Sequence, residues 1–326
     1  MEQILKSGYL CNPQQVYTLR RVTINEGKAK GASVIEVSTA GGLQVDILPD
    51  SGMDIGQVRY KGVNMTFISK NGYDCPSSFT PWEDEFLRTF PGGLLYTCGM
   101  RTAGGGHRDD NGEWQPFHGR YHGLQADQIA AFVEDNTIII KGTIRETALF
   151  GCCMELRRTI RIPVMGAEIS IEDTITNQAH LPEEYMMLYH CNFGYPFLSD
   201  KARVELPEDR KTTARTEFAV SGLGKEHTFD APTPGEEERV FFHENMERTV
   251  SIVNEEIGAK MTLCWGETLP ILVHWRSMAS GDYACGLEPT NCYIMGRKDE
   301  RDNGTLPVLQ PYESVKTQLH FRFDSI

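Results

Sequence analysis

One histidine in this chain stands where a strand is expected to meet a bend. His190 follows the apolar run Tyr185–Leu188 and precedes Gly194 and Pro196, residue types that end strands. The unperturbed pKa of a histidine is about 6.5, so small environmental shifts let the ring give or take a proton near neutral pH. A histidine held at a strand end and facing a cavity could act as an acid or a base, whereas one bonded into a core or turn would do neither.

A glutamate late in the chain offers the complementary group. Glu288 follows a predicted strand and precedes Pro289, which restricts the backbone of Glu288 to an extended conformation and gives its carboxylate a defined direction. One glutamate and one histidine suffice for general acid–base catalysis if they face each other across a substrate. The alternative is a surface acid at a strand end, and the long sequence separation from His190 leaves their distance in space open.

A second histidine pair lies nearer the N-terminus. His118 and His122 are four residues apart, and on a helix they would share a face and could bind a metal ion. Gly119 and Gly123 argue against a helix, and they favour a loop whose backbone comes close to a ligand. Metal binding is therefore the weaker alternative here.

The stretch 70–117 connects two strand-rich regions. It is rich in glycine, proline and aromatic residues, and a connection of this length in a compact domain is usually functional. Thr80 and Pro81 predict the start of a short helix with an acidic first turn, which Pro91 ends. Arg88, near the end of this helix, is either an exposed surface residue or a clamp for a ligand.

Alternating apolar and polar residues predict strands at 33–69 and from 128 onward. Two apolar strand faces carry one charged exception each, Arg158 and Asp173. Since an isolated buried charge is costly, we expect these two residues to pair with each other or with the ligand.

Many short strands and almost no helix predict an all-β fold of stacked, mainly antiparallel sheets over one large core. The polar stretch 207–238 is expected to be a surface excursion, because strands resume on both sides, and 299–306 is expected to be a loop. We therefore expect a single domain over 1–326, with residues 1–30 as an N-terminal extension packed on it.

Composition narrows the classes of partner. The net charge of −13 argues against binding to nucleic acid or to an anionic membrane surface, both of which need clustered Lys and Arg. No apolar run approaches the ~18 residues of a membrane-spanning helix, and the first residues do not form a secretory signal. Nine scattered cysteines without a Cys-x-x-Cys pair predict free thiols in a reducing cytoplasm and no cysteine-held zinc.

Several motifs together resemble one known family. Their order along the chain is similar to that in the aldose 1-epimerase (galactose mutarotase) superfamily, most closely in a poorly characterised bacterial branch, over roughly residues 30 to 323. The motifs are Gly52-Met53-Asp54-Ile55, Arg88-Thr89-Phe90, Gly92-Gly93-Leu94-Leu95 with Thr97-Cys98-Gly99, His118-Gly119-Arg120, Glu155-Leu156-Arg157-Arg158-Thr159-Ile160, Tyr189-His190-Cys191-Asn192-Phe193-Gly194-Tyr195-Pro196 and Gly286-Leu287-Glu288-Pro289-Thr290-Asn291.

The resemblance implies a β-supersandwich with a concave sugar site and an enzyme that interconverts the α and β anomers of a free aldose. By motif position, His190 would protonate the ring oxygen and Glu288 would remove the proton of the anomeric hydroxyl. His118 would bind or orient the sugar, and Arg88 would hold a hydroxyl. This chemistry needs no metal and no cofactor, and the expected partner is a small sugar, with a homodimer left open.

Further substrate-binding residues follow from the same resemblance and from residue type. Asp54 or Asp173 would be the sugar-binding aspartate, Asn192 and His122 would contact the substrate, and Trp275 would supply a flat apolar wall. Trp82 and Trp114 are alternative walls. Arg120 is where galactose mutarotases have a glycine, and together with Arg88 or Arg297 it would suit an acidic or phosphorylated sugar. Our hypothesis is that Arg120 faces the site and selects an anionic group.

Two other function classes remain open. The chain could be a carbohydrate-binding protein that has lost turnover, or a metal-dependent sugar isomerase with His118, His122, His190 and Glu288 as ligands. Glycoside cleavage is less favoured, because it usually needs two carboxylates ~5–9.5 Å apart and the sequence offers one good candidate.

Overall fold

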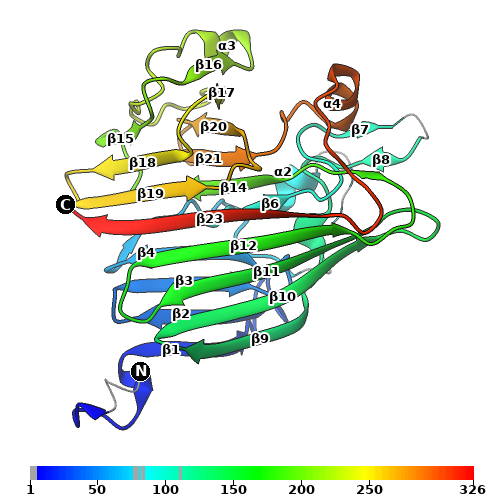
Figure 1. Cartoon of the computed structure of the whole chain (residues 1–326). Coiled ribbons are helices and arrows are strands. Elements are labelled where there is room, and N and C mark those ends of the chain that lie inside the picture. The colour runs from blue at the N-terminus through cyan, green and yellow to red at the C-terminus, as the bar shows by residue number, and fades with distance from the viewer. Residues whose placement is uncertain (1–5, 76–79, 81, 83–84, 110–111) are drawn as a thin grey trace.

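The computed structural model (Figure 1) describes the chain except for residues 1–5, 76–79, 81, 83–84 and 110–111. In the described part, antiparallel sheets of five, eight and six strands hold most of the regular structure, and two two-stranded sheets lie beside them. The prediction of an all-β fold of stacked, mainly antiparallel sheets with few short helices is therefore confirmed.

The strands of each sheet follow in their spatial order. The five-stranded sheet comprises β1 Tyr17–Thr23, β2 Ser33–Thr39, β3 Leu43–Leu48, β4 Asp54–Tyr60 and β5 Val63–Asn64. The eight-stranded sheet comprises β15 Ala202–Glu205, β18 Thr249–Asn254, β19 Ala259–Trp265, β23 Ser314–Ser325, β12 Glu168–Asn177, β11 Cys153–Pro163, β10 Thr137–Thr147 and β9 Asp127–Glu134. The six-stranded sheet comprises β16 Lys211–Ala214, β17 Arg239–Glu244, β20 Ile271–Ser277, β21 Ala284–Thr290, β14 Leu188–Phe193 and β6 Tyr96–Cys98.

The remaining elements are short. The small sheets pair β13 Glu183–Glu184 with β22 Val308–Leu309 and β7 His107–Arg108 with β8 Trp114–Gln115. The helices are the single turns η1 Pro13–Gln15 and η3 Tyr121–Gly123 and the α-helices α2 Glu85–Thr89, α3 Glu217–Val220 and α4 Arg297–Asn303.

Most predicted strands coincide with observed ones, and one predicted loop does not. Residues 299–306 were expected to be irregular, but α4 covers 299–303 of this range. Asp299 and Glu300 lie in its first turn, where carboxylates stabilise the positive end of a helix, and Gly304 at φ 71° closes its C-terminus. The predicted short helix is seen as α2; Thr80 precedes it without helical structure, and Pro81 lies outside the described residues.

The main core lies between the eight-stranded sheet and the two other large sheets. Ile160 of β11, Val45 of β3 and Leu287 of β21 are almost fully buried in the same hydrophobic cluster. Burial of each such side chain contributes about 1.5–3 kcal/mol to folding. Both other sheets are thus held against one broad apolar face (Figure 1).

A charged cluster is embedded in this core. The Arg158 guanidinium donates to both oxygens of Asp173, at 3.0 and 2.8 Å, and to Asp54 Oδ1 at 2.8 Å. The side chains of all three residues are completely buried. The predicted pairing of Arg158 with Asp173 is confirmed, and Tyr189 adds a hydroxyl that donates to Asp173 Oδ2 at 2.8 Å.

The six-stranded sheet has two different faces because side chains alternate along a strand. Tyr189 and Cys191 of β14 and Leu287 of β21 point into the main core. Their neighbours His190 and Glu288 point the other way and line a cavity. The core therefore fixes the sheet on one face while the other face presents polar groups to a hollow.

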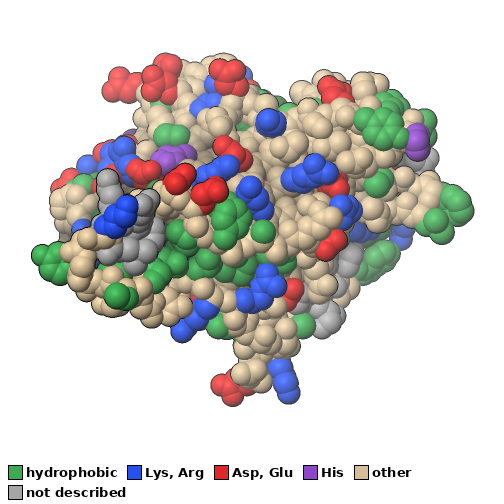
Figure 2. Space-filling view, turned by 60° about the horizontal axis from the view of Figure 1, so that its bottom comes forward, with side chains coloured by type: hydrophobic (Ala, Val, Ile, Leu, Met, Phe, Trp, Pro, Cys, Tyr) green, Lys and Arg blue, Asp and Glu red, His purple; other side chains and the backbone are tan. Residues whose placement is uncertain are grey.

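The outer surface mixes charges of both signs. On the face shown in Figure 2, Lys and Arg side chains are interspersed with Asp and Glu, and hydrophobic side chains form groups between them. Within the described residues, none of the helices has the length and apolar character needed to cross a bilayer.

Candidate functional site

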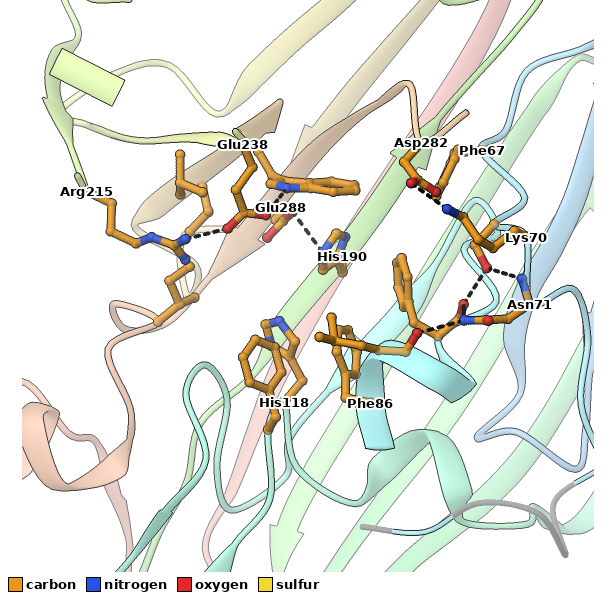
Figure 3. A pocket seen from close by; sticks show the side chains of 18 residues that line it. Phe67, Lys70, Asn71, Phe86, His118, His190, Arg215, Glu238, Asp282 and Glu288 are labelled. Carbon is orange, nitrogen blue, oxygen red and sulfur yellow. Dashed lines mark hydrogen bonds and ion pairs between the residues drawn. The ribbon is translucent and has the colours of Figure 1, made fainter. Parts of the chain in front are cut away.

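A cavity of about 570 Å³ lies on the outer face of the six-stranded sheet (Figure 3). Small-molecule sites commonly have volumes of ~300–1,000 Å³, so this one can take a ligand of sugar size or larger. The described residues that line it are Phe67, Ser69, Lys70, Asn71, Phe86, Leu87, Phe90, Phe117, His118, His190, Arg215, Glu238, Val240, Val273, Trp275, Asp282, Glu288 and Ile294.

His190 and Glu288 meet in this cavity. In the β14–β21 pair, Leu188 lies opposite Thr290 and Cys191 opposite Leu287, so His190 lies directly across from Glu288. His190 Nε2 is 3.3 Å from Glu288 Oε1 (Figure 3). The two groups therefore share one hollow but touch each other, whereas the sequence predicted a substrate between them. Both residues also lie within their strands and not at strand ends.

The protonation of this pair is controlled by burial. Burial raises the pKa of Glu288 well above its usual range, the charge of Glu238 adds to the rise, and Arg215 opposes it. Burial lowers the pKa of His190 to about 3, an effect that the Asn192 side chain partly offsets. Both directions disfavour a carboxylate beside an imidazolium, so burial favours the form of the pair that holds its proton on Glu288.

Two atoms of the pair have no hydrogen-bond partner among the described residues. They are His190 Nδ1 and Glu288 Oε1, and both are buried. A buried polar atom without a partner costs about 1–3 kcal/mol, and such atoms in native proteins concentrate where a ligand or a reaction uses them. Their presence in a cavity marks this place as the candidate site.

A glycine makes room for the Glu288 carboxylate. Gly286 lies two residues earlier on β21, on the same face of the sheet, opposite Trp275 of β20. A Cβ at Gly286 would stand 2.2 Å from Glu288 Oε1 and 3.2 Å from the Trp275 Cβ. Since real Cβ contacts are never so short, any side chain at this position would displace the carboxylate.

His118 brings a second imidazole to the cavity. The Gly104 N–H donates to His118 Nδ1 at 3.2 Å, so the neutral ring carries its proton on Nε2. Burial lowers the pKa of His118 well below its ordinary value, and charge on His190 or Arg215 would lower it further. His118 is thus a neutral hydrogen-bond donor, held by ring contacts that include Phe86 at 4.9 Å between centroids.

The structure of the loop after His118 contradicts the expectation that its glycines bring the backbone close to a ligand. Gly119 adopts φ 81°, and a Cβ there would stand 2.4 Å from the Gly99 carbonyl oxygen. The close approach that requires this glycine is to another backbone segment and not to a ligand.

Sequence reasoning missed two charged residues in the cavity. Arg215 follows β16 and Glu238 precedes β17, so both belong to or border the excursion 207–238 that we expected only at the surface. Arg215 Nη2 lies 2.5 Å from Glu238 Oε1, and Trp275 Nε1 donates to Glu238 Oε2 at 2.7 Å. The available signal was weak: the two residues flank a pair of strands at the same end.

Trp275 lies where the sequence predicted an apolar wall. Its ring stands edge-on to those of His190, at 5.5 Å between centroids, and Phe67, at 6.3 Å. Its indole N–H is occupied by Glu238, so the ring presents only its apolar surface to a ligand.

A family model and several solved structures are similar to this chain. The family model described as "Domain of unknown function (DUF4432)" matches residues 29–323. The chain belongs to the DUF4432 family. No curated protein sequence matches this DUF4432 chain.

Solved structures resemble the DUF4432 chain in fold. One is a "putative aldose 1-epimerase" from Klebsiella pneumoniae subsp. pneumoniae, 22% identical with a TM-score of 0.87 over 96% of this chain and 86% of that chain. A galactose mutarotase-like protein from Clostridium acetobutylicum is 15% identical, with a TM-score of 0.66 over 96% and 100%. A galactose 1-epimerase from Lactobacillus acidophilus is 12% identical, with a TM-score of 0.63 over 94% and 99%. The chain thus has the fold of these aldose 1-epimerase and galactose mutarotase-like structures, as the motifs indicated.

Two predicted substrate contacts lie beneath the site of the DUF4432 chain and do not reach it. Asp54 is fully buried, and its oxygens accept from Thr97 and Arg158. His122 Nδ1 lies 2.9 Å from Asp54 Oδ2, and its ring stacks on Tyr96. Neither lines the cavity, nor does Asp173, so this cluster carries no sugar-binding aspartate.

The three arginines proposed as substrate ligands also lie elsewhere. Arg88 is on the surface, with 78% of its side chain exposed beside Glu85. Arg120 donates to the Trp114 carbonyl oxygen at 3.0 Å and does not line the cavity, contrary to our hypothesis. Arg297 is buried between Glu183 and Glu184.

Asn192 and two tryptophans require the same correction. Asn192 is buried, and its amide donates to the His190 carbonyl oxygen at 2.9 Å and to that of Gly93 at 3.1 Å, so it supports β14 and does not contact a ligand. Trp82 and Trp114 pack on each other at 5.2 Å outside the cavity.

The four residues of the metal-site alternative do not converge. His122 is held by Asp54, away from the cavity that contains His118, His190 and Glu288. Among the described residues, no group of three or more His, Cys, Asp or Glu side chains has a metal-binding arrangement.

Proposed function

We propose that this DUF4432 protein is a mutarotase that interconverts the α and β anomers of a reducing sugar. The observation that carries the proposal is the contact between His190 Nε2 and Glu288 Oε1 inside a cavity of small-molecule size. An acid and a base in contact match this reaction better than an acid and a base on opposite sides of a ring.

The reason lies in the substrate. The ring oxygen and the anomeric hydroxyl oxygen are bonded to the same carbon, C1. A base for the hydroxyl proton and an acid for the ring oxygen must therefore lie side by side. Cross-strand neighbours on one sheet face meet this requirement, and each well-placed group typically contributes ~10²–10⁴-fold.

The proton balance closes within the pair. Glu288 as carboxylate takes the proton of the anomeric hydroxyl, whose O–H electron pair forms the C1=O bond. The C1–O bond to the ring oxygen breaks, and that oxygen takes the proton of the His190 imidazolium. The pair reaches the carboxylate–imidazolium form when its one proton passes from Glu288 to His190 across their contact, and it ends as carboxyl and imidazole, so its total charge stays at zero. Rotation about C1–C2 and reversal of the steps give the other anomer.

Other cavity residues have supporting roles in this proposal. The His118 Nε2–H would donate to a sugar hydroxyl, and its ring stands perpendicular to that of His190 at 5.7 Å between centroids. Trp275 would stack on the apolar face of the sugar ring, with its N–H already satisfied by Glu238.

The test is anomer exchange measured by NMR on a panel of aldoses, uronic acids and sugar phosphates. We expect protein-dependent exchange that falls by at least ~10²-fold in His190→Ala and in Glu288→Gln. His180→Ala and Glu172→Gln, at exposed positions, are the matched controls and should retain full activity. Binding of a sugar without exchange by the wild-type chain would instead identify a carbohydrate-binding protein.

A second candidate, glycoside hydrolysis, is favoured by Glu238. Sequence reasoning found one suitable carboxylate, whereas Glu238, Asp282 and Glu288 all line the cavity, and Glu238 is the one whose charge acts on Glu288. Glu288, with its raised pKa, would be the acid and Glu238, paired with Arg215, the second carboxylate. Release of nitrophenol from a panel of nitrophenyl glycosides, lost in Glu238→Gln, would support this function in place of the first.

A further inference from the structure

The charges in the cavity indicate what it does not bind. Two cationic side chains line it, and each has a carboxylate partner: Lys70 Nζ lies 2.7 Å from Asp282 Oδ2, and Arg215 Nη2 lies 2.5 Å from Glu238 Oε1. Among the described lining residues, no unpaired cation remains for a phosphate or a carboxylate on a sugar. A neutral ligand avoids the cost of breaking these pairs.

The wall formed by α2 uses its polar groups internally. The Asn71 amide donates to the carbonyl oxygens of Leu87 and Phe90, both at 3.0 Å, and the Ser69 hydroxyl donates to Phe90 at 2.5 Å. These bonds anchor the C-terminal end of α2 (Figure 3). The side chains that the wall offers to the cavity are Phe86, Leu87 and Phe90.

Much of the cavity lining is apolar. Half of the eighteen lining residues are apolar or aromatic. Leu87 lines the cavity with 68% of its surface exposed, so folding leaves it largely uncovered. A hexose alone would face these groups with hydroxyls that lose their hydrogen bonds to water.

We propose that the substrate is a neutral reducing sugar that carries an apolar substituent, an acyl, alkyl or aryl group, which packs against Phe86 and Leu87 of α2. This inference rests on the proposed function for the reacting end of the ligand. The sugar end lies at His190 and Glu288, and the substituent covers the wall that α2 presents.

The first test measures binding in a variant that cannot turn over. In the His190→Ala/Glu288→Gln double variant, calorimetry compares glucose and galactose with their benzyl ethers, substituted at the C2, C3, C4 or C6 hydroxyl, and with their 6-phosphates. We expect one or more benzyl ethers to bind at least ~10-fold more tightly than the parent sugar and the phosphates to bind more weakly than it. A parent sugar or a phosphate that binds best would overturn the proposal.

The second test localises the substituent. Leu87→Ser should lower the affinity for the benzyl ether far more than the affinity for the parent sugar, whereas Leu181→Ser, at another exposed leucine, should change neither. A preference that survives in Leu87→Ser refutes this placement. The binding test does not depend on turnover. Absence of anomer exchange in the wild-type chain would therefore refute the mutarotase function, while the preference for a benzyl substituent would still be measured.

Discussion

His190 on β14 and Glu288 on β21 are directly opposed across two antiparallel strands, on the face of the six-stranded sheet that turns away from the main core. Their distance is therefore set by sheet geometry and not by loops. Both strands bury alternate residues, such as Cys191 and Leu287, so the register cannot slip without moving these side chains out of the core.

The pH dependence of anomer exchange should be that of a His190–Glu288 pair that is active when it holds one proton. Activity is lost on the acid side when the pair takes a second proton, and burial lowers the pKa of His190 to about 3. We therefore expect no fall in kcat/KM around pH 6.5, the ordinary value for histidine. On the alkaline side, activity should persist through neutral pH, because burial raises the pKa of Glu288. An acid limb near pH 6.5, in a chain shown by circular dichroism to be folded, would contradict this arrangement.

The Glu288 carboxyl should reduce the stability of the fold at neutral pH. Its pKa is raised in the folded state, so the folded chain holds this proton more tightly than the unfolded chain. Stability from this group is complete below the unfolded pKa of about 4.3 and is lost as the pH rises through the folded pKa. Glu288→Gln should therefore raise Tm at pH 8 and leave it nearly unchanged at pH 4. An equal Tm change at both pH values would mean that the carboxyl has an ordinary pKa.

The Gly286→Ala variant tests whether the position of the Glu288 carboxylate matters for activity, independently of the stability of the fold. The backbone of Gly286 is in an ordinary strand conformation, and the first clash of an added methyl group is with the flexible end of the Glu288 side chain. We expect anomer exchange to fall by at least ~10-fold, since displacement of a catalytic group costs this much or more, while Tm changes little. Gly105→Ala, where the backbone φ is not positive and an added methyl meets only the Met295 carbonyl oxygen at 3.9 Å, gives the comparison for a glycine that does not line the cavity. Full activity in Gly286→Ala would show that the carboxylate position is not critical.

The fold and part of the site could be predicted from the sequence because strands have a clear side-chain period. Period-two alternation assigns residues to strand faces, and it located β23 and the pairing of Arg158 with Asp173. Alternation does not say which strands are neighbours, so the contact of His190 with Glu288 could not be derived from it. Motif position misassigned Arg88 and residue type misassigned Arg120, because a surface arginine and a ligand-binding arginine look alike in a sequence.

Arg215 and Glu238 show the opposite error. They lie within the polar stretch 207–238, whose composition is typical of a surface loop, yet β16 and β17 carry them to the cavity. Asp54 and His122 gave a misleading signal too, since buried polar residues near a site are as often part of its foundation as of its binding surface. In this chain they join Arg158 below the sheet.

Arg158 is the residue whose loss should damage this foundation most. Arg158→Met would leave the carboxylates of Asp54 and Asp173 buried without their cation, and removal of one partner from a buried ion pair costs about 3–5 kcal/mol. Urea unfolding should show a loss of that size. Arg157→Met is the matched control one residue earlier: 68% of that side chain is exposed, and Glu155 keeps Arg145 as a second partner. The control should lose no more than ~1 kcal/mol. Equal losses in the two variants would mean that the buried cluster contributes no more to stability than a surface ion pair does.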